Sequence, residues 1–281
     1  MLILRRVLVL SLALVLSLTF VGCEGLPQGE IDQIIAGATA SQFDTVSFDM
    51  RMPMEVSVTG ESSTVTTSIS LDINNGVMDV ANEEMYYAMA IMMEMPLMGE
   101  QEVTGDVYLV DGWMYTRMEF FGLGEQWVKT EVNEETWQQQ DPLSGQLEFL
   151  AAAVEVNYLR TETVDGVECY LFEIVPDMEA LGELLSEETA GMGMIDFSQF
   201  DLAELCTDLS VREWIAVDSS LIMKVEIYLA LEMSASEAGV SEEGIDSVTT
   251  EVTMVVNFHD YDEPVFIELP PEALEAEELP D

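Results

Sequence analysis

The sequence predicts an α+β protein, mainly antiparallel β, in which a strongly curved sheet carries a few helices on one side. Apolar and polar residues alternate strictly over Ser47–Val58, and the same period of two returns in Glu83–Pro96. The dipeptide Asp111-Gly112 stands between two further alternating runs, which is typical of a β-hairpin. Helical spacing is confined to a few connecting stretches, so strands dominate the predicted fold.

The two alternating stretches place methionine where packed cores normally use Val, Ile and Leu. One face of these strands carries ten residues that we expect to line an apolar ligand cavity: Phe48, Met50, Met52, Met54, Val56, Met85, Tyr87, Met89, Ile91 and Met93. Two other interpretations stay open. The stripe could simply pack against the helices, or its thioethers could bind a soft metal such as Cu(I).

The first half of the chain reads as a helix followed by strands. Apolar residues at helical spacing predict an amphipathic helix over Glu30–Phe43. Alternation then predicts strands over Asp44–Gly60, Glu61–Asn74, Val77–Val80, Met85–Met95, Glu102–Val110, Trp113–Phe120 and Gln126–Glu131. Turns are expected at Asn74-Asn75-Gly76, near Pro96–Gly99, and at Asp111-Gly112.

The second half mixes helical and strand-like segments. Helices are expected over Asn133–Val156 and Met178–Glu188, with one more helical turn over Asp201–Cys206. The predicted strands are Asn157–Thr163, Val167–Val175, Ser210–Val217, Leu221–Met233 and Ser247–Phe258, and the first two are joined at Asp165-Gly166. The chain closes on Glu272–Glu278, which has helical composition.

The N-terminus has the pattern of a secretory signal. Arg5 and Arg6 precede the apolar run Val7–Val21, which is too short to span a membrane as a helix. Phe20-Val21-Gly22-Cys23 resembles a lipobox, which predicts lipidation of Cys23; an ordinary signal peptide with an incidental cysteine is the alternative. We therefore expect a signal peptide over 1–22, a tether over 23–29, one domain over 30–270 and an acidic tail over 271–281.

The charge of the chain excludes one class of partner. Residues from Cys23 onward carry six basic and 55 acidic side chains, a net charge of −49. Such a field repels nucleic acid and anionic lipid head groups. Because the acidic residues are scattered along the chain, they favour solubility or a salty habitat over a specific cation site.

The sequence offers little for catalysis. His259 is the only histidine, and there is no nucleophile elbow, phosphate-binding glycine loop or Cys-x-x-Cys pair. We expect no enzyme activity, no cofactor and no metal. Cys169 and Cys206 could form a disulfide outside the cytoplasm or remain two free thiols.

Several short motifs together resemble the LolA and LolB lipoprotein-localisation factors and the LppX/LprG-type lipid-carrier lipoproteins. These motifs are Val46–Val58, Val107–Tyr115, Gln126–Lys129, Asp165–Ile174, Arg212–Asp218 and Tyr261–Pro270. The resemblance implies a half-open β-barrel wrapped over helices, with a hydrophobic cavity that holds acyl chains. The high negative charge departs from the pattern for proteins that meet anionic membranes.

These observations predict an extracytoplasmic lipoprotein, anchored in the cell membrane, that binds a lipid or other long apolar ligand and carries it in the cell envelope. The first alternative is a structural lipoprotein with a filled core, whose acidic outer face meets a protein partner. The second alternative is copper binding through methionine.

Overall fold

The computed structural model describes residues 25–61, 63–95, 99–120, 124–133, 153–178, 202–236 and 244–279, together with residues 137, 143, 147, 150, 181 and 238. The predicted signal peptide and Cys23 lie outside this part. So do most of the two long helical connections expected around residues 133–156 and 178–188.

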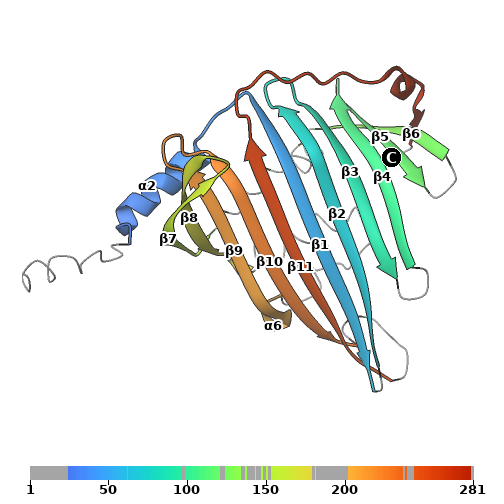
Figure 1. Ribbon diagram of the computed structural model, residues 1–281, viewed down its shortest axis with the longest axis horizontal. Coiled ribbons are helices and arrows are strands. Elements are labelled where there is room, and N and C mark those ends of the chain that lie inside the picture. Colours follow the sequence, from blue (N-terminus) through green and yellow to red (C-terminus); the bar gives the residue numbers. More distant parts are fainter. Residues whose placement is uncertain are drawn as a thin grey trace, which may run out of the picture.

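The described strands form one open sheet of twelve strands in the order β12-β6-β5-β4-β3-β2-β1-β11-β10-β9-β8-β7 (Figure 1). Every pairing is antiparallel except that of β12 with β6. The strands are β1 (Thr45–Gly60), β2 (Ser63–Asp79), β3 (Glu84–Met95), β4 (Gly99–Val110), β5 (Trp113–Phe120), β6 (Gly124–Glu131), β7 (Glu155–Val164), β8 (Val167–Val175), β9 (Cys206–Ala216), β10 (Ile222–Ser234), β11 (Ile245–His259) and β12 (Glu277–Glu278). This confirms the predicted fold class.

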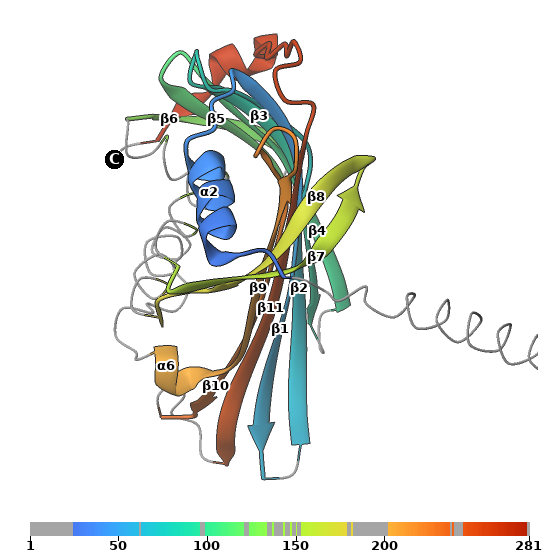
Figure 2. The ribbon, with the colours of Figure 1, turned by 90° about the vertical axis from the view of Figure 1, so that its left-hand side faces the viewer.

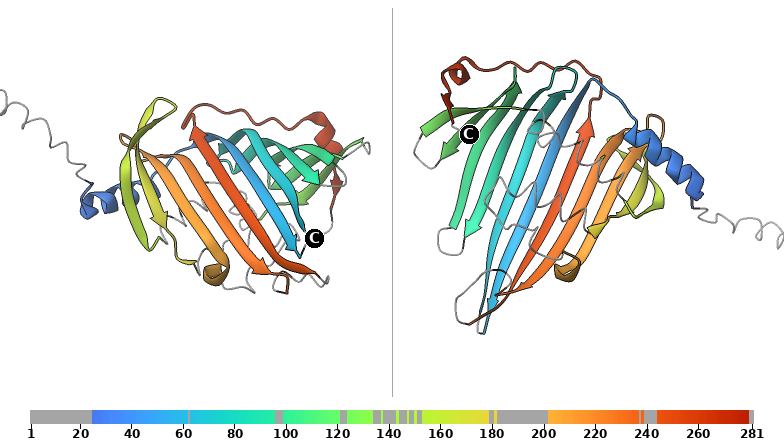
Figure 3. Two further views of the ribbon diagram at one scale, coloured as in Figure 1. Left: turned by 60° about the horizontal axis from the view of Figure 1, so that its bottom comes forward. Right: turned by 180° about the vertical axis from the view of Figure 1, so that it is seen from behind.

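The helices lie on one side of the sheet, as the sequence predicts. Helix α2 (Gln28–Thr39) and the short α6 (Leu202–Leu205) face the same side, and β6 and β7 at the two ends of the sheet reach over that side (Figures 2 and 3). Ile31 and Ala38 of α2 are buried in the same apolar cluster as the sheet residues Phe48 and Phe258. We call the side of the sheet that carries this cluster the inner face, and the opposite side the outer face.

Helix α2 is fixed by a close approach at its C-terminal half. A side chain on Gly37 would place its Cβ 2.9 Å from Oγ of Ser220, which lies in the turn between β9 and β10. The absence of a side chain on Gly37 lets the helix dock beside this turn. In this position α2 lies over one end of the inner face (Figure 2). No helix in the described part of the chain is long and apolar enough to cross a membrane.

The two predicted Asp-Gly hairpins are confirmed. Asp111 and Gly112 both have positive φ angles, 53° and 77°, and join β4 to β5. Asp165 and Gly166 do the same between β7 and β8, with φ angles of 48° and 88°. Two consecutive positive φ angles are what a tight hairpin of the type I′ family requires.

The turn predicted at Asn74-Asn75-Gly76 is wrong. Strand β2 runs through these residues to Asp79, and the pairing with β1 shifts between Phe48 and Met50. Asn75 takes up the irregularity with a φ of 54°, as in a β-bulge. A Cβ on Gly76 would lie 2.6 Å from the Phe48 ring, so the glycine makes room for that ring rather than ending the strand.

Two further predictions need correction. Cys206 begins strand β9 and does not end a helix, which is limited to Leu202–Leu205. The C-terminal segment forms a 3-10 helix over Pro271–Glu275, and β12 then pairs in parallel with β6 at Val128 and Lys129. The chain therefore covers one edge of its own sheet, which protects the edge from pairing with another chain.

Candidate functional site

The ten apolar residues predicted to line a cavity all lie on the inner face. The strand register sets Met54 of β1 opposite Ile69 of β2, and Ile69 opposite Met93 of β3. The next row joins Met52, Leu71 and Ile91 in the same way. Because side chains alternate along a strand, the other predicted residues of β1 and β3 share this face.

Burial divides the ten residues into three groups. Phe48 and Met85 are fully buried and belong to the core. Met50, Tyr87 and Met89 are half-buried and pack against that core. The remaining five, Met52, Met54, Val56, Ile91 and Met93, are half-buried but belong to neither apolar core cluster of the described residues.

These five residues and Ile69 define what we call the open inner patch. It lies toward the far ends of β1 and β2, which have 16 and 17 residues and span about 54 Å at 3.4 Å per residue. Helix α2 covers the opposite end, where Phe48 lies. The inner face is thus filled at one end and partly exposed at the other. The assignment of the patch to a ligand stays a prediction.

A hollow of about 410 Å³ lies over the same strands, but its lining is mixed. Alongside Met54, Ile69 and Met93 it contains outer-face groups such as Arg51 and Glu251. This hollow is not the apolar cavity that the sequence predicts. A long apolar ligand would have to lie along the open inner patch instead.

One functional candidate was missed from the sequence. Glu213 of β9 is fully buried, and among the described residues its Oε1 and Oε2 have no hydrogen-bond partner. The register places it between Phe172 of β8 and Val225 of β10, both buried on the inner face. Burial raises the pKa of this carboxyl to about 8. The sequence gives one indication of its position: Glu213 stands two residues from both Val211 and Ile215, which lie on the inner face of β9, and residues two apart on a strand share a face.

The outer face holds the positive charges of the described chain in ion pairs. Each of its six Lys and Arg residues has a carboxylate within 4 Å; the pairs are Arg51–Asp72, Arg117–Asp106, Lys129–Glu278, Arg160–Glu162, Arg212–Glu226 and Lys224–Glu226. Surface pairs of this kind contribute little to stability, about 0–1 kcal/mol each.

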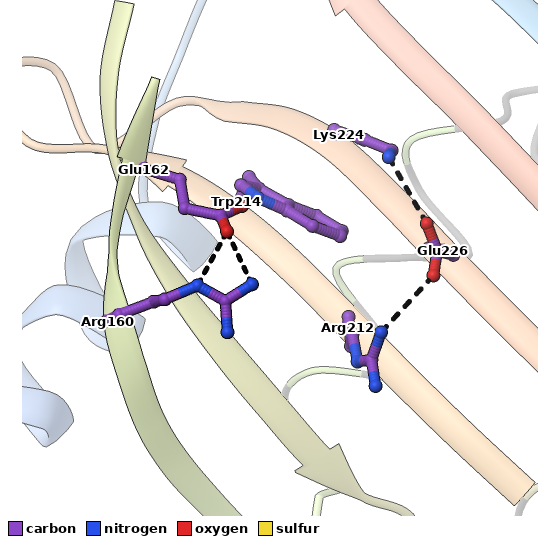
Figure 4. Close-up of polar contacts among 6 residues, drawn as sticks. All are labelled: Arg160, Glu162, Arg212, Trp214, Lys224 and Glu226. Carbon is purple, nitrogen blue, oxygen red and sulfur yellow. Dashed lines mark hydrogen bonds and ion pairs between the residues drawn. The ribbon is translucent and has the colours of Figure 1, made fainter. Parts of the chain in front are cut away.

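Three of these cations gather around Trp214 on β7, β9 and β10 (Figure 4). Trp214 Nε1 donates to Glu162 Oε2 at 2.9 Å, and the ammonium of Lys224 lies 4.4 Å from the centre of the indole ring. The indole and Arg160 together hold the pKa of Glu162 below its ordinary value. Trp214 also packs with Cys169, Leu171, Ala216 and Met223 in a second, outer-face core cluster. We assign this network a structural role, because the hydrogen bond between Trp214 and Glu162 joins β9 to β7.

The polar candidates of the sequence do not form a site. His259 ends β11, where Nδ1 lies 2.8 Å from Asp260 Oδ2. Cys169 and Cys206 are free thiols that lie far apart. Cys169 of β8 pairs with Ala216, the last residue of β9, whereas Cys206 is the first residue of β9. The ten residue steps along β9 separate the two positions by about 33 Å at 3.3 Å per residue. In the described residues, no three His, Cys, Asp or Glu side chains are grouped to hold a metal.

Comparison with known proteins concerns the fold alone. No family model matches the chain, and no curated protein sequence matches it. Among solved structures, the Mycobacterium tuberculosis lipoprotein LppX matches 85% of this chain and 97% of its own, with 13% identity and a TM-score of 0.39. LprF from Mycobacterium bovis matches 87% and 98%, with 12% identity and a TM-score of 0.42. A LolA superfamily protein from Nitrosomonas europaea matches 85% and 94%, with 12% identity and a TM-score of 0.21.

The comparison thus finds the same group of proteins that the sequence motifs resemble. The fold belongs to the class of open, curled antiparallel sheets with helices on the inner side.

Proposed function

We propose that this chain is an extracytoplasmic, membrane-anchored lipoprotein that binds a lipid or other long apolar ligand along the open inner patch, without catalysis. The observation that carries this proposal is the division of the inner face. At one end, Phe48 and Met85 are fully buried, whereas Met54 and Met93 at the other end stay partly exposed on the same strands.

The composition of the patch suits an apolar ligand of variable shape. Met52, Met54 and Met93 carry unbranched thioethers, which adapt to irregular apolar surfaces better than branched side chains do. Covering such side chains stabilises a complex by about 25 cal/mol for each Å² removed from water. Extended, elongated geometry along β1, β2 and β3 favours a chain-like ligand over a compact one.

The membrane anchor rests on the sequence around Cys23. If Cys23 carries the lipid, four residues lie between it and Gln28, the first residue of α2, which makes five Cα–Cα steps. At about 3.5 Å per residue these can span about 17 Å. Such a short tether would hold the α2 end of the sheet close to the bilayer and leave the open inner patch pointing away from it.

A double variant tests the proposal. Met52→Asp together with Met93→Asp places two carboxylates on the open inner patch, and burying a charge without a partner under an apolar ligand is costly. The control Met92→Asp changes the next residue of β3, which points to the outer face and is 38% exposed. Binding of the neutral fluorophore N-phenyl-1-naphthylamine should fall at least tenfold in the double variant and stay unchanged in the control.

Equal binding by a folded double variant would exclude the open inner patch as the site. If the unchanged protein failed to bind the fluorophore and lipid alike, the filled-core interaction lipoprotein would become the better account. The control separates an effect of position from the effect of added negative charge.

A further inference from the structure

A buried acid on the inner face is hard to explain by stability alone. Glu213 is fully buried, and neither carboxyl oxygen has a hydrogen-bond partner in the part of the chain that the structure describes. A buried polar group without a partner costs about 1–3 kcal/mol, and an apolar residue of similar size would avoid that cost. A carboxyl left unpaired at that cost points to a partner from outside the protein.

The described groups around Glu213 do not supply that partner. Its neighbours across the strands, Phe172 and Val225, are apolar. The cations nearest in sequence, Arg212 and Lys224, point to the outer face, where both pair with Glu226. The carboxyl of Glu213 therefore lies in an apolar layer, with the charged network of Figure 4 on the other side of the sheet.

The carboxyl lies on the same face of the sheet as the open inner patch. The register continues the row of Glu213 through Val225, Val256 and Met50. Three strand spacings of about 4.8 Å separate Glu213 from Met50 by about 14 Å. Met52, the first residue of the patch, follows Met50 on the same face of β1. A ligand lying along the patch thus shares a face of the sheet with Glu213 and is separated from it by a buried apolar row.

The chemistry of the carboxyl selects the kind of head group. Because burial raises its pKa to about 8, the group is mostly protonated at neutral pH, and it then both donates and accepts a hydrogen bond. An anionic head group would have to enter a chain whose residues from Cys23 onward carry a net charge of −49. An ammonium would form a buried ion pair, whose desolvation offsets most of its attraction. An uncharged hydroxyl group matches a protonated acid in both of its hydrogen-bonding roles.

We propose that Glu213 is the polar anchor of the ligand site and that it takes the hydroxyl head group of an uncharged, long-chain amphiphile, such as a fatty alcohol or a monoacylglycerol. The inference rests on the proposed function, because the tail of the same ligand would occupy the open inner patch. Val225 and Val256, which stand between Glu213 and Met50, are fully buried in the core, so the head group would reach Glu213 only by displacing this packing.

Competition with two matched ligands tests the inference. The chain from residue 23 onward contains every described element, and Cys23→Ser makes it free of lipid. N-phenyl-1-naphthylamine is displaced from it with 1-dodecanol, which has a hydroxyl, and with 1-chlorododecane, which has the same chain without a donor. The ratio of the two competition constants is then compared between the parent protein, Glu213→Leu and Glu213→Gln.

Glu213→Leu should reduce the preference for the alcohol about tenfold while leaving the affinity for the chloroalkane nearly unchanged, since one hydrogen bond to a buried group is lost. Glu213→Gln should keep most of the preference, because an amide also donates and accepts. The same ratio in Glu213→Leu and the parent protein would overturn the role of Glu213 and leave the apolar site intact. Failure of both ligands to displace the fluorophore would overturn the proposed function together with the inference.

Discussion

Replacing Glu213 by Gln should change how the stability of the protein depends on pH. The pKa of this carboxyl is raised by burial from an ordinary value of 4.5 to about 8. A group with a raised pKa in the folded state contributes its full stability below the unfolded pKa, and the contribution is lost as the pH rises toward the folded pKa. At 1.36 kcal/mol per pH unit, the loss between pH 4.5 and pH 7 is about 3 kcal/mol.

The assay is urea unfolding of the parent protein and Glu213→Gln at both pH values in the same salt concentration. The other 54 acidic residues titrate in both proteins, so the difference between the two isolates Glu213. We expect Glu213→Gln to gain about 3 kcal/mol relative to the parent protein on going from pH 4.5 to pH 7. Glu232→Gln, which removes an exposed carboxylate from neighbouring β10, controls for the loss of one charge. A difference that does not change with pH would refute the burial of an unpaired acid.

Three further outcomes follow from the fold. Gly76→Ala should lower the free energy of unfolding by about 2 kcal/mol, because its Cβ would lie 2.6 Å from the Phe48 ring. The control in urea unfolding is Gly29→Ala, whose Cβ would have nothing within 4 Å. Equal effects of the two substitutions would contradict the bulge. Trp214→Phe should cost about 1 kcal/mol in the same assay by removing the hydrogen bond to Glu162, and an unchanged stability would mean that this bond contributes nothing. Cys169 and Cys206 should both react with iodoacetamide in denaturant after the folded protein has been kept under oxidising conditions; a mass showing an intramolecular disulfide would contradict their separation along β9.

The strands could be predicted because one side of most of them packs against the core while the other meets water. Because of that difference, apolar and polar residues alternate along β1 and β3. The Asp-Gly turns identify the hairpins of β4–β5 and β7–β8. The Met-rich face could be predicted for the same reason. Its division into a buried end and an open end could not, because the division depends on which elements, α2 among them, pack over the inner face.

Two local features escaped prediction because their signals are ambiguous. Asn74-Asn75-Gly76 has the composition of a turn, and only the position of the Phe48 ring shows that the glycine serves a bulge within β2. The end of β9 is apolar on both faces, with Ile215 on the inner and Trp214 on the outer side. Apolar and polar residues no longer alternate there, so the sequence suggests that the acid at position 213 points to the outer face.

The parallel pairing of β12 with β6 could not be foreseen either. Strands are assigned from periodicity, and the two residues Glu277 and Glu278 are too few to show any. Their composition favours a helix, whereas the free edge of β6 offers hydrogen bonds that a helical tail would leave unused. The tertiary contact decides the conformation in this case.

Native mass spectrometry tests the central claim most directly. The protein from residue 23 onward, with Cys23→Ser, would be measured as purified and after incubation with lipids extracted from cell envelopes. We predict a stoichiometric lipid adduct that is absent from the Met52→Asp, Met93→Asp double variant and present in Met92→Asp. A mass without any adduct under both conditions would contradict lipid binding and favour a lipoprotein that acts through a protein partner.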